Sequence, residues 1–250
     1  MALPEVVSRQ EWLAARKALL VREKEATRAR DALNADRRRL PMVEVDKPYR
    51  FEGPDGEVGL FDLFEGRRQL IVEHVMFDPS WDEVCRSCAG RLDNLGRLEH
   101  LHARQTTLVA VSRAPYPKLR RSQTRMGWTL PWFSSYGGDF NYDFHVTIDD
   151  SVMPAEYNYR TAAEHAAAGA PLDFAQPFEL PGQSCFLRDG DRVFHTYSAY
   201  ARGTEAVGGT YYYLDLTALG RQEDWEEPKD RAGGAPSAGQ AGVRFRDEYA

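Results

Sequence analysis

The residues Leu70-Ile71-Val72-Glu73-His74-Val75-Met76-Phe77 precede a short loop that leads to Cys85-Arg86-Ser87-Cys88. The first of these segments is apolar apart from two residues, which predicts a strand buried on both faces of a sheet. Leucines then recur at helical spacing from Leu92 to about Arg104. A strand that delivers a CxxC motif to the first turn of a helix is the arrangement that makes one thiol reactive. This stretch therefore predicts both the core of the fold and a candidate dithiol site.

The segments that follow extend this pattern to a whole domain. Thr106–Val111 is a second buried strand, and a strand, helix and strand at this spacing form a βαβ unit with parallel strands. Gln183–Leu187 and Arg192–Tyr197, joined at Asp189-Gly190, predict a β-hairpin. This order is that of an α/β thioredoxin-like fold, a central mixed sheet flanked by helices, with an insert before the final β-hairpin. Further helices are expected at 118–125 and 161–170, and further strands at 49–51, within 141–148 and at 211–216.

The two ends of the chain differ from this thioredoxin-like domain of residues 42–222. Ser8 and Glu11 fit a capping box that starts a helix, and a proline later stops it, so residues 1–41 are expected to form an N-terminal helical arm. The arm is expected to pack along the body of the protein or along a second copy, which would make a homodimer. The composition of residues 223–250, rich in Gly, Pro, Ala, Gln and charge, predicts a disordered tail.

The composition argues against several classes of function. The 250 residues carry a net charge of −6 with a pI near 5.6, so no basic field points to nucleic acid. No apolar run reaches the roughly 20 residues that span a bilayer, and the N-terminus lacks the pattern of a secretory signal. Three cysteines are too few for a disulfide framework. We therefore expect a cytoplasmic protein that binds neither nucleic acid nor membrane.

The CxxC motif can exchange disulfides if one thiol attacks as a thiolate and the other resolves the mixed disulfide. Cys85 is expected to be the exposed nucleophile, because backbone N–H groups and the helix dipole favour its thiolate. Cys88, one turn further on, is expected to be more buried and to resolve. Arg86 lowers the pKa of Cys85 whereas Asp82 and Glu83 raise it, so the sequence leaves the net direction open. The expected partner is a protein or small-molecule thiol or disulfide, with no metal or organic cofactor.

Other functions of the cysteines stay open. They can be small buried hydrophobes that cap the helix. They can be half of a zinc site that Cys185 and His195 complete through the fold. The alternative to an enzyme is a thioredoxin-like scaffold without catalytic activity, which only binds partners through its tryptophan-rich insert. Trp81, Trp128 and Trp132 can wall a hydrophobic cleft beside the motif or belong to the core.

A histidine in the final hairpin is a candidate for a supporting role. In a hairpin that turns at Asp189-Gly190, His195 falls opposite Ser184 within about one residue. Its strand heads back to the end of the sheet that carries the motif. His195 could therefore exchange protons near Cys85, or it could be satisfied inside the sheet.

An arginine is a second supporting candidate. Arg113 follows the second parallel strand, at the carboxyl end of the sheet where α/β proteins tend to bind ligands. It could steady a thiolate or an anionic substrate. It could also simply pair with Asp82 or Asp143.

Several motifs spread along the chain carry a family resemblance. They are Val75-Met76-Phe77, Asp78 with Trp81 before Cys85-Arg86-Ser87-Cys88, Ser112-Arg113-Ala114-Pro115, Arg125-Met126-Gly127-Trp128, Pro131-Trp132, Ser134-Ser135, Asp139-Phe140-Asn141 with Asp143, and His195-Thr196-Tyr197-Ser198 with Arg202-Gly203. From about residue 8 to about residue 222 the chain resembles the DUF899 family, described as thioredoxin-like predicted dithiol–disulfide oxidoreductases. The resemblance implies a thioredoxin-like fold and disulfide exchange at the CxxC motif.

Two related families sharpen this expectation. Peroxiredoxins carry Pro-x-x-x-Thr-x-x-Cys, whereas Asp78 and Asp82 stand at the matching positions here. A carboxylate three residues before the nucleophile would repel a thiolate and a hydroperoxide anion, so a thiol peroxidase is the weaker alternative. Thioredoxins place a cis-proline before the strand that opens the final hairpin. The matching position falls at Gly182, so Pro181 fills it with a one-residue slip or the proline is lost.

Overall fold

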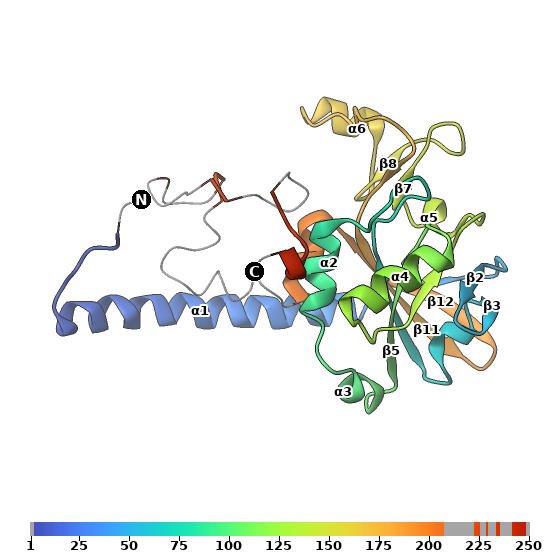
Figure 1. The fold of residues 1–250 in the computed structure, drawn as a ribbon. Helices are drawn as coiled ribbons and strands as arrows, with labels where there is room; N and C mark the ends of the chain where they lie inside the picture. Colours follow the sequence, from blue (N-terminus) through green and yellow to red (C-terminus); the bar gives the residue numbers. More distant parts are fainter. Residues whose placement is uncertain (1–2, 208–222, 226–228, 230–233, 236–241, 249–250) are drawn as a thin grey trace.

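The structure is a computed structural model that describes residues 3–207, 223–225, 229, 234–235 and 242–248 (Figure 1). The strand expected at 211–216 lies outside these residues. Within the described part of the chain, no helix is long and apolar enough to cross a membrane.

Helices and strands alternate along most of the chain. In chain order they are α1 (Arg9–Arg37), β1 (Val43–Glu44), β2 (Arg50–Gly53), β3 (Gly56–Gly59), the 3-10 helix η1 (Asp62–Phe64), β4 (Gln69–His74), α2 (Arg86–Asp93), α3 (Glu99–His102), β5 (Thr106–Ser112), α4 (Tyr116–Met126), β6 (Trp132–Ser134), α5 (Phe140–Asp143), β7 (Thr147–Ile148), β8 (Glu156–Tyr157), β9 (Arg160–Thr161), α6 (Ala162–Ala167), β10 (Phe178–Glu179), β11 (Gly182–Asp189), β12 (Arg192–Tyr200), and the 3-10 helices η2 (Ala201–Val207) and η4 (Arg246–Glu248).

Eight strands form one sheet in the order β1-β12-β11-β4-β5-β6-β2-β3. β4 pairs in parallel with β5, and β5 with β6. β11 pairs antiparallel with both β4 and β12. The strand that leads to the cysteines therefore lies between a parallel neighbour, reached through α2, and the final hairpin. This confirms the predicted thioredoxin-like α/β fold with its βαβ unit and terminal hairpin.

Each face of the sheet carries its own hydrophobic cluster. The α2 cluster covers the face under α2 and α4, to which these helices contribute Leu92 and Leu119 (Figure 1). The phenylalanine cluster covers the other face and includes Phe51, Phe64, Phe133, Phe140, Phe144 and Phe186. Alternate residues of a strand face opposite sides. Leu70 and Val72 of β4 therefore join the phenylalanine cluster, whereas Ile71 packs against the α2 cluster.

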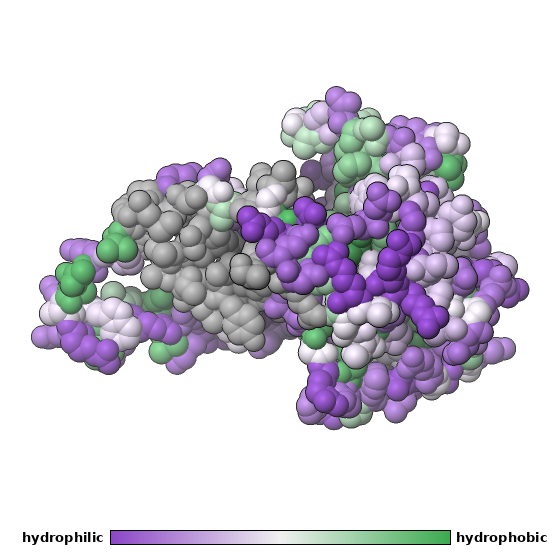
Figure 2. Space-filling view, in the orientation of Figure 1, coloured by the Kyte–Doolittle hydropathy of each residue, from purple (hydrophilic) through white to green (hydrophobic). Residues whose placement is uncertain are grey.

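The predicted helical arm is present as α1. Glu11 N–H donates to the Ser8 side chain and Ser8 N–H donates to the Glu11 carboxylate, which is the expected capping box. None of the helix residues, all of them described, is buried. Hydrophobic residues lie among hydrophilic ones along the arm (Figure 2), and the side chain of Trp12 is exposed. In the last turn, the Arg37 guanidinium lies 4.6 Å from the ring centroid of Tyr197 in β12. A second copy along this arm stays a prediction.

Two secondary-structure predictions were wrong in detail. The helix expected over Leu92–Arg104 is broken into α2 and α3. The run Asn94-Leu95-Gly96 interrupts it, because these positions include poor helix formers and the Asn94 side chain donates to the Gly90 carbonyl at 2.6 Å. In the segment 141–148 a short helix precedes the strand, so only β7 is extended.

The final hairpin turns one residue later than expected. Its two turn residues are Gly190 and Asp191, and Gly190 has a φ of 61°, a left-handed conformation that suits glycine. Between this turn and Phe186 the strands consequently pair two residues further along than expected, and a bulge between Cys185 and Phe186 adds one residue beyond that point. His195 lies opposite Phe186 rather than opposite Ser184.

Part of the tail that was expected to be disordered packs on the body of the protein. Phe245 is 2% exposed and belongs to the α2 cluster. Arg125 of α4 pairs with Asp247 at 2.8 Å. For residues 242–248 the structure therefore differs from the expected disorder, because an aromatic ring followed by carboxylates finds partners on α2 and α4.

Candidate active site

Cys85 is the N-cap residue of α2, so the predicted placement of the motif at the start of a helix is confirmed. Its N–H donates to the carbonyl oxygen of Met76 at 3.0 Å, which ties the motif to the segment that follows β4. Cys85 is partly exposed, whereas Cys88 is only 4% exposed. Both thiols are free and the two side chains are hydrogen bonded to each other. One accessible thiol beside a buried one is what disulfide exchange requires.

The surroundings lower the pKa of Cys85 to about 6. The largest cause is the hydrogen bond from the Cys88 thiol, and the backbone N–H groups of Cys88 and Ser87 add to it against the effect of burial. Arg86, the cation that the sequence suggested, is not among the main causes, and it faces Glu83 at 3.6 Å. The net direction, which the sequence left open, is therefore toward the thiolate. Donors of the first helical turn produce it rather than a side-chain charge.

The pKa of Cys88 is raised well above its usual range, first by the hydrogen bond to Cys85 and then by burial. Arg91, on the next turn of α2, acts in the opposite direction. Arg91 forms an ion pair with the buried Glu73 of β4, to which Gln183 of β11 also donates at 2.7 Å. Glu73 was not predicted from the sequence as a site residue. The sequence feature that could have identified it is a carboxylate within an otherwise apolar strand.

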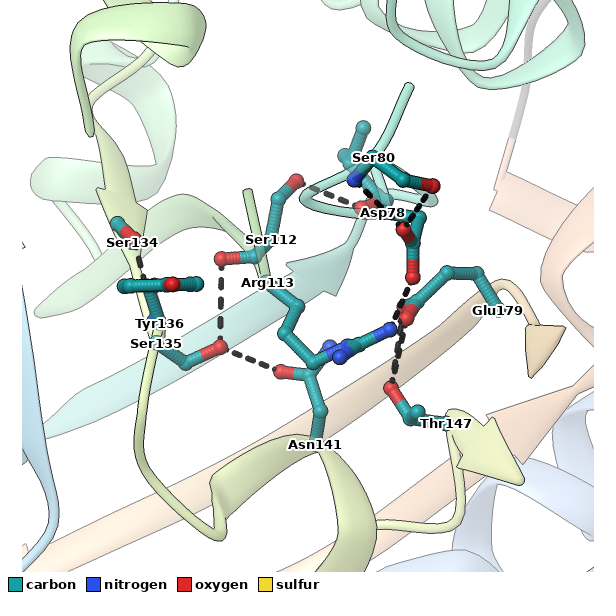
Figure 3. A network of polar contacts seen from close by, with 11 residues as sticks. Asp78, Ser80, Ser112, Arg113, Ser134, Ser135, Tyr136, Asn141, Thr147 and Glu179 are labelled. Carbon is teal, nitrogen blue, oxygen red and sulfur yellow. Dashed lines mark hydrogen bonds and ion pairs between the residues drawn. The ribbon is translucent and has the colours of Figure 1, made fainter. Parts of the chain in front are cut away.

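The loop between β4 and the motif begins in a buried polar network (Figure 3). Asp78 accepts hydrogen bonds from Ser80 N–H at 2.7 Å and from the guanidinium of Arg113. Arg113 Nε donates to Glu179 of β10 at 2.7 Å, and Thr147 Oγ1 lies 3.0 and 3.1 Å from the two Glu179 oxygens. Figure 3 shows the Arg113 side chain reaching toward both carboxylates. The network therefore ties the start of the cysteine loop to the segment before the final hairpin.

Two further side chains fix the backbone around this loop. Lys118 Nζ of α4 donates to the carbonyl oxygens of Pro79 at 2.8 Å and Trp81 at 2.7 Å. Ser112, at the end of β5, donates to the carbonyl oxygen of Val75 at 2.6 Å. The loop is therefore held from α4 and from β5. The motif is presented by backbone that is anchored on both sides.

The tryptophans lie on the same side of the sheet as the thiols. Trp81, Trp128 and Cys85 all pack, partly buried, against the α2 cluster. Trp128 Nε1 also donates to Asp93 at the end of α2 at 2.8 Å. Trp132 is 3% exposed and is part of the core. Trp81 and Trp128 thus pack against the same cluster as Cys85, and the ring of Trp132, within that cluster, lies 5.8 Å from the ring of Trp128.

Arg113 is not placed at the thiols, because none of its described contacts reaches either sulfur. Its charge is balanced by Asp78 and Glu179, not by Asp82 or Asp143 as the sequence suggested. Burial raises the pKa of Glu179 and the adjacent guanidinium acts against this rise. An arginine that already holds two carboxylates positions the loop rather than binding a further anion.

Pro181 lies at the end of the sheet from which the cysteine loop leaves. It directly precedes β11, whose first residue, Gly182, pairs with His74 at the end of β4. The peptide bond before Pro181 is trans. Among the described residues the cis peptide bond is Gln176–Pro177.

His195 is not brought to the thiols. Through its pairing with Phe186 it is level with Leu70 of β4, and at ~3.3 Å per residue that is roughly 13 Å from the end of the strand. Its ring lies 5.2 Å from that of Phe144, in the phenylalanine cluster on the opposite face from α2. Its Nε2 lies 2.8 Å from Ser198 Oγ, and burial lowers its pKa. The second interpretation from the sequence, a histidine satisfied inside the sheet, fits this position.

The third cysteine also lies away from the motif. Cys185 is a β11 residue paired with Ile71, and burial raises its pKa. In the part of the chain that the structure describes, no three His, Cys, Asp or Glu side chains gather closely enough to hold a metal ion. The zinc set with Cys185 and His195 is therefore not assembled in these residues.

Comparison with known proteins identifies a family but no activity. The family model for DUF899, bacterial protein of unknown function, matches residues 1–249. No curated protein matches the chain in sequence.

Solved structures resemble this chain at low identity. A cysteine-to-serine mutant of peroxiredoxin Q from Xanthomonas campestris is 11% identical, with a TM-score of 0.42, over 67% of this chain and 91% of that chain. The reduced 2-Cys peroxiredoxin of Plasmodium vivax is 14% identical, with a TM-score of 0.39, over 70% and 88%. A candidate protein disulfide isomerase from Bacteroides thetaiotaomicron is 16% identical, with a TM-score of 0.37, over 67% and 88%. Similarities this distant transfer no activity to the chain.

Proposed function

The chain belongs to the DUF899 family, and from the chemistry of its site we propose that it is a thiol–disulfide oxidoreductase. Cys85 is the nucleophile and Cys88 is the resolving thiol. The observation that carries the proposal is the geometry of the pair. Cys85 is the partly exposed N-cap residue of α2 and is hydrogen bonded to the buried Cys88, which lowers the pKa of Cys85 and raises that of Cys88. Such a division of roles favours attack by one defined sulfur.

In the first step the Cys85 thiolate attacks one sulfur of a substrate disulfide. A bond forms between the Cys85 sulfur and that substrate sulfur, and the substrate disulfide bond breaks. The other substrate sulfur leaves as a thiolate. With a pKa of about 6, Cys85 is mostly ionised near neutral pH, so no separate base is needed for this step.

The second step is favoured by the loss of the Cys85 charge. In the mixed disulfide, Cys85 no longer carries the anion whose hydrogen bond and charge raise the pKa of Cys88. Arg91 remains nearby and lowers that pKa. Cys88 therefore gives its proton to the leaving substrate thiolate or to water and attacks Cys85. The Cys85–substrate bond breaks, the second substrate sulfur leaves as a thiolate, and the protein keeps a Cys85–Cys88 disulfide.

The two steps together move two electrons from the protein to the substrate disulfide. Cys88 supplies one proton and water supplies the other, because Cys85 starts as a thiolate. An external dithiol reductant returns the protein to its starting state by the same chemistry in reverse. The residues around Arg113 take no part in the bond changes. They hold the loop that presents Cys85.

The two alternatives have less support. For a binding module, the tryptophans of the insert would have to face a partner, but Trp132 is in the core and Trp128 is tied to Asp93. For a thiol peroxidase, Asp78 and Asp82 occupy the positions of the peroxiredoxin proline and threonine. Asp78 is already engaged by Arg113.

Trapping of the mixed disulfide tests the proposal. With a small disulfide and a dithiol reductant, the wild type should turn over. With the small disulfide alone, the pre-reduced Cys88→Ser variant should accumulate substrate on Cys85, as seen by intact mass. Cys85→Ser should trap nothing, and Cys185→Ser, the matched control, should behave like the wild type. Equal turnover by the wild type and the Cys85→Ser variant would contradict the proposal.

A further inference from the structure

The C-terminal segment Gly242–Glu248 occupies a site between α2 and α4. Phe245 is 2% exposed and packs into the α2 cluster. Two guanidinium groups lie over its ring, with Cζ of Arg86 at 5.2 Å and Cζ of Arg125 at 4.8 Å from the ring centroid. A ring so placed combines apolar burial with cation–π attraction.

The residues after this ring match the surface in charge. Arg125 Nε and Nη2 donate to the two carboxylate oxygens of Asp247 at 2.8 and 3.0 Å, a two-point arrangement typical of arginine–carboxylate recognition. A carboxylate oxygen of Glu248 lies 3.7 Å from Arg86 and 3.9 Å from Arg125. Arg125 also donates to the carboxylate of Glu83 at 2.7 Å. One of the carboxylates that contact this arginine therefore lies outside the C-terminal segment.

The same surface adjoins the nucleophile. Arg86 is the residue that follows Cys85, and Cys85 and Trp81 pack against the cluster that contains Phe245. Figure 1 shows the C-terminal helix η4 beside α2. A segment seated here therefore contacts the residue next to the nucleophile.

We propose that the surface formed by Arg86 and Arg125 beside Cys85 binds substrate peptides in which an aromatic residue is followed by carboxylates. The chain's own residues 242–248 occupy this surface as an internal competitor. This inference deepens the proposed thiol–disulfide exchange and rests on it, since it names the class of substrate that reaches Cys85.

The ion pairs that hold residues 242–248 on this surface are weak enough for the segment to be displaced. The side chains of Arg125 and Asp247 are 38% and 43% exposed, and those of Arg86 and Glu248 are 48% and 34% exposed. Ion pairs this accessible to water are individually weak. Attachment to the same chain raises the effective concentration of the segment, so an incoming peptide has to compete with it. A small disulfide that does not need the surface has no such competitor.

Removal of residues 243–250 tests this competition. The substrates are bis(2-hydroxyethyl) disulfide and a synthetic peptide, Val-Arg-Phe-Arg-Asp-Glu, extended by a cysteine in a disulfide with cysteamine. The control peptide has alanine in place of phenylalanine. We expect truncation to raise kcat/KM for the aromatic peptide by about tenfold, as for removal of a tethered competitor. We expect the small disulfide to change by less than about twofold, because it does not use the surface.

Point variants keep the test independent of the deletion. Phe245→Ala in the full chain should give the same gain for the aromatic peptide alone. In the truncated chain, Arg125→Ala should abolish the preference for the aromatic peptide over the alanine peptide. Arg121→Ala, an exposed arginine of the same helix, should retain it. Equal rates for the two peptides, or a truncation that slows the aromatic peptide, would overturn the inference.

Direct binding separates the inference from the proposed function. A fluorescently labelled peptide without the cysteine is titrated into the truncated Cys85→Ser variant, and its anisotropy is followed. If the peptide binds while no disulfide is turned over, the oxidoreductase proposal fails and the surface stands. If the small disulfide is turned over while the peptide does not bind, the surface assignment fails and the oxidoreductase proposal stands.

Discussion

Replacement of Cys88 by alanine removes the hydrogen bond on which the reactivity of Cys85 depends. This bond is the largest cause of the lowered pKa of Cys85, which is about 6. At that pKa roughly nine-tenths of Cys85 is thiolate at pH 7, whereas a free cysteine with a pKa of about 8.5 is only about 3% ionised. The rate of alkylation of wild-type Cys85 should therefore rise as the pH passes about 6 and then level off.

The size of the change follows from the strength of the bond. A hydrogen bond to a charged group contributes about 1.5–3 kcal/mol, and about 1.36 kcal/mol corresponds to one pH unit. Cys88→Ala should therefore move the midpoint of the alkylation profile upward by about one to two pH units. Cys88→Ser keeps a hydroxyl donor and should move the midpoint less, so it is the matched control.

The assay is the rate of iodoacetamide labelling in a Cys185→Ser background across the acid to alkaline range, with the labelled residue assigned by mass spectrometry. The wild type should show a midpoint near 6 for Cys85 and much slower labelling of Cys88. A common midpoint for the alanine and serine variants of Cys88 would refute the hydrogen-bond reasoning. So would a wild-type midpoint at the ordinary cysteine value.

Three further outcomes are expected in urea unfolding of the reduced protein. Arg113→Ala should destabilise by about 3–5 kcal/mol because it leaves two buried carboxylates without their cation, whereas loss of the exposed Arg192 should change the stability far less. Similar losses for the two variants would contradict the network. Gly53→Ala should destabilise the protein by about 1–3 kcal/mol because the new Cβ would lie 2.6 Å from a buried phenylalanine ring. Gly90→Ala, in open space within α2, should stabilise the protein by up to about 1 kcal/mol. A change of stability in the same direction for both variants would contradict the packing. Folding lowers the pKa of the Cys85 thiol, so the ionised thiol stabilises the folded protein. This contribution is complete above the pKa of about 8.5 that Cys85 has in the unfolded chain, and it is lost as the pH falls through the folded-state pKa of about 6. Compared with Cys85→Ser, the wild type should therefore gain stability over that interval, and a constant difference would contradict the shift.

Features that depend on residues near in sequence could be predicted from the sequence. The strand at 70–77, the CxxC motif at the start of α2 and the final hairpin were all found, because hydrophobic periodicity and turn residues report local structure. The capping box of Ser8 and Glu11 was found for the same reason. The parallel pairing of β4 with β5 followed from the length of the connection between them.

Features that depend on distant residues were missed or misplaced. Arg113 pairs with Glu179, 66 positions away, and no local pattern selects that partner over another carboxylate. The placement of His195 failed because a turn displaced by one residue changes the pairings between the turn and Phe186 by two, and a bulge between Cys185 and Phe186 adds one more beyond it. Phe245 was missed because one aromatic residue in a tail of Gly and Ala gives no periodic signal. The direction of the Cys85 pKa needed the positions of backbone donors, which a sequence does not contain.

A redox titration of the whole protein decides whether Cys85 and Cys88 form a reversible couple. The protein is equilibrated with glutathione at a series of thiol-to-disulfide ratios and quenched by alkylation. Its mass is then measured by intact-protein mass spectrometry. We predict a single two-electron transition in which both thiols lose their label together, present in Cys185→Ser and absent in Cys85→Ser and Cys88→Ser. A wild type that keeps both thiols labelled at every ratio, or a Cys85→Ser variant that still shows the transition, would contradict the assignment.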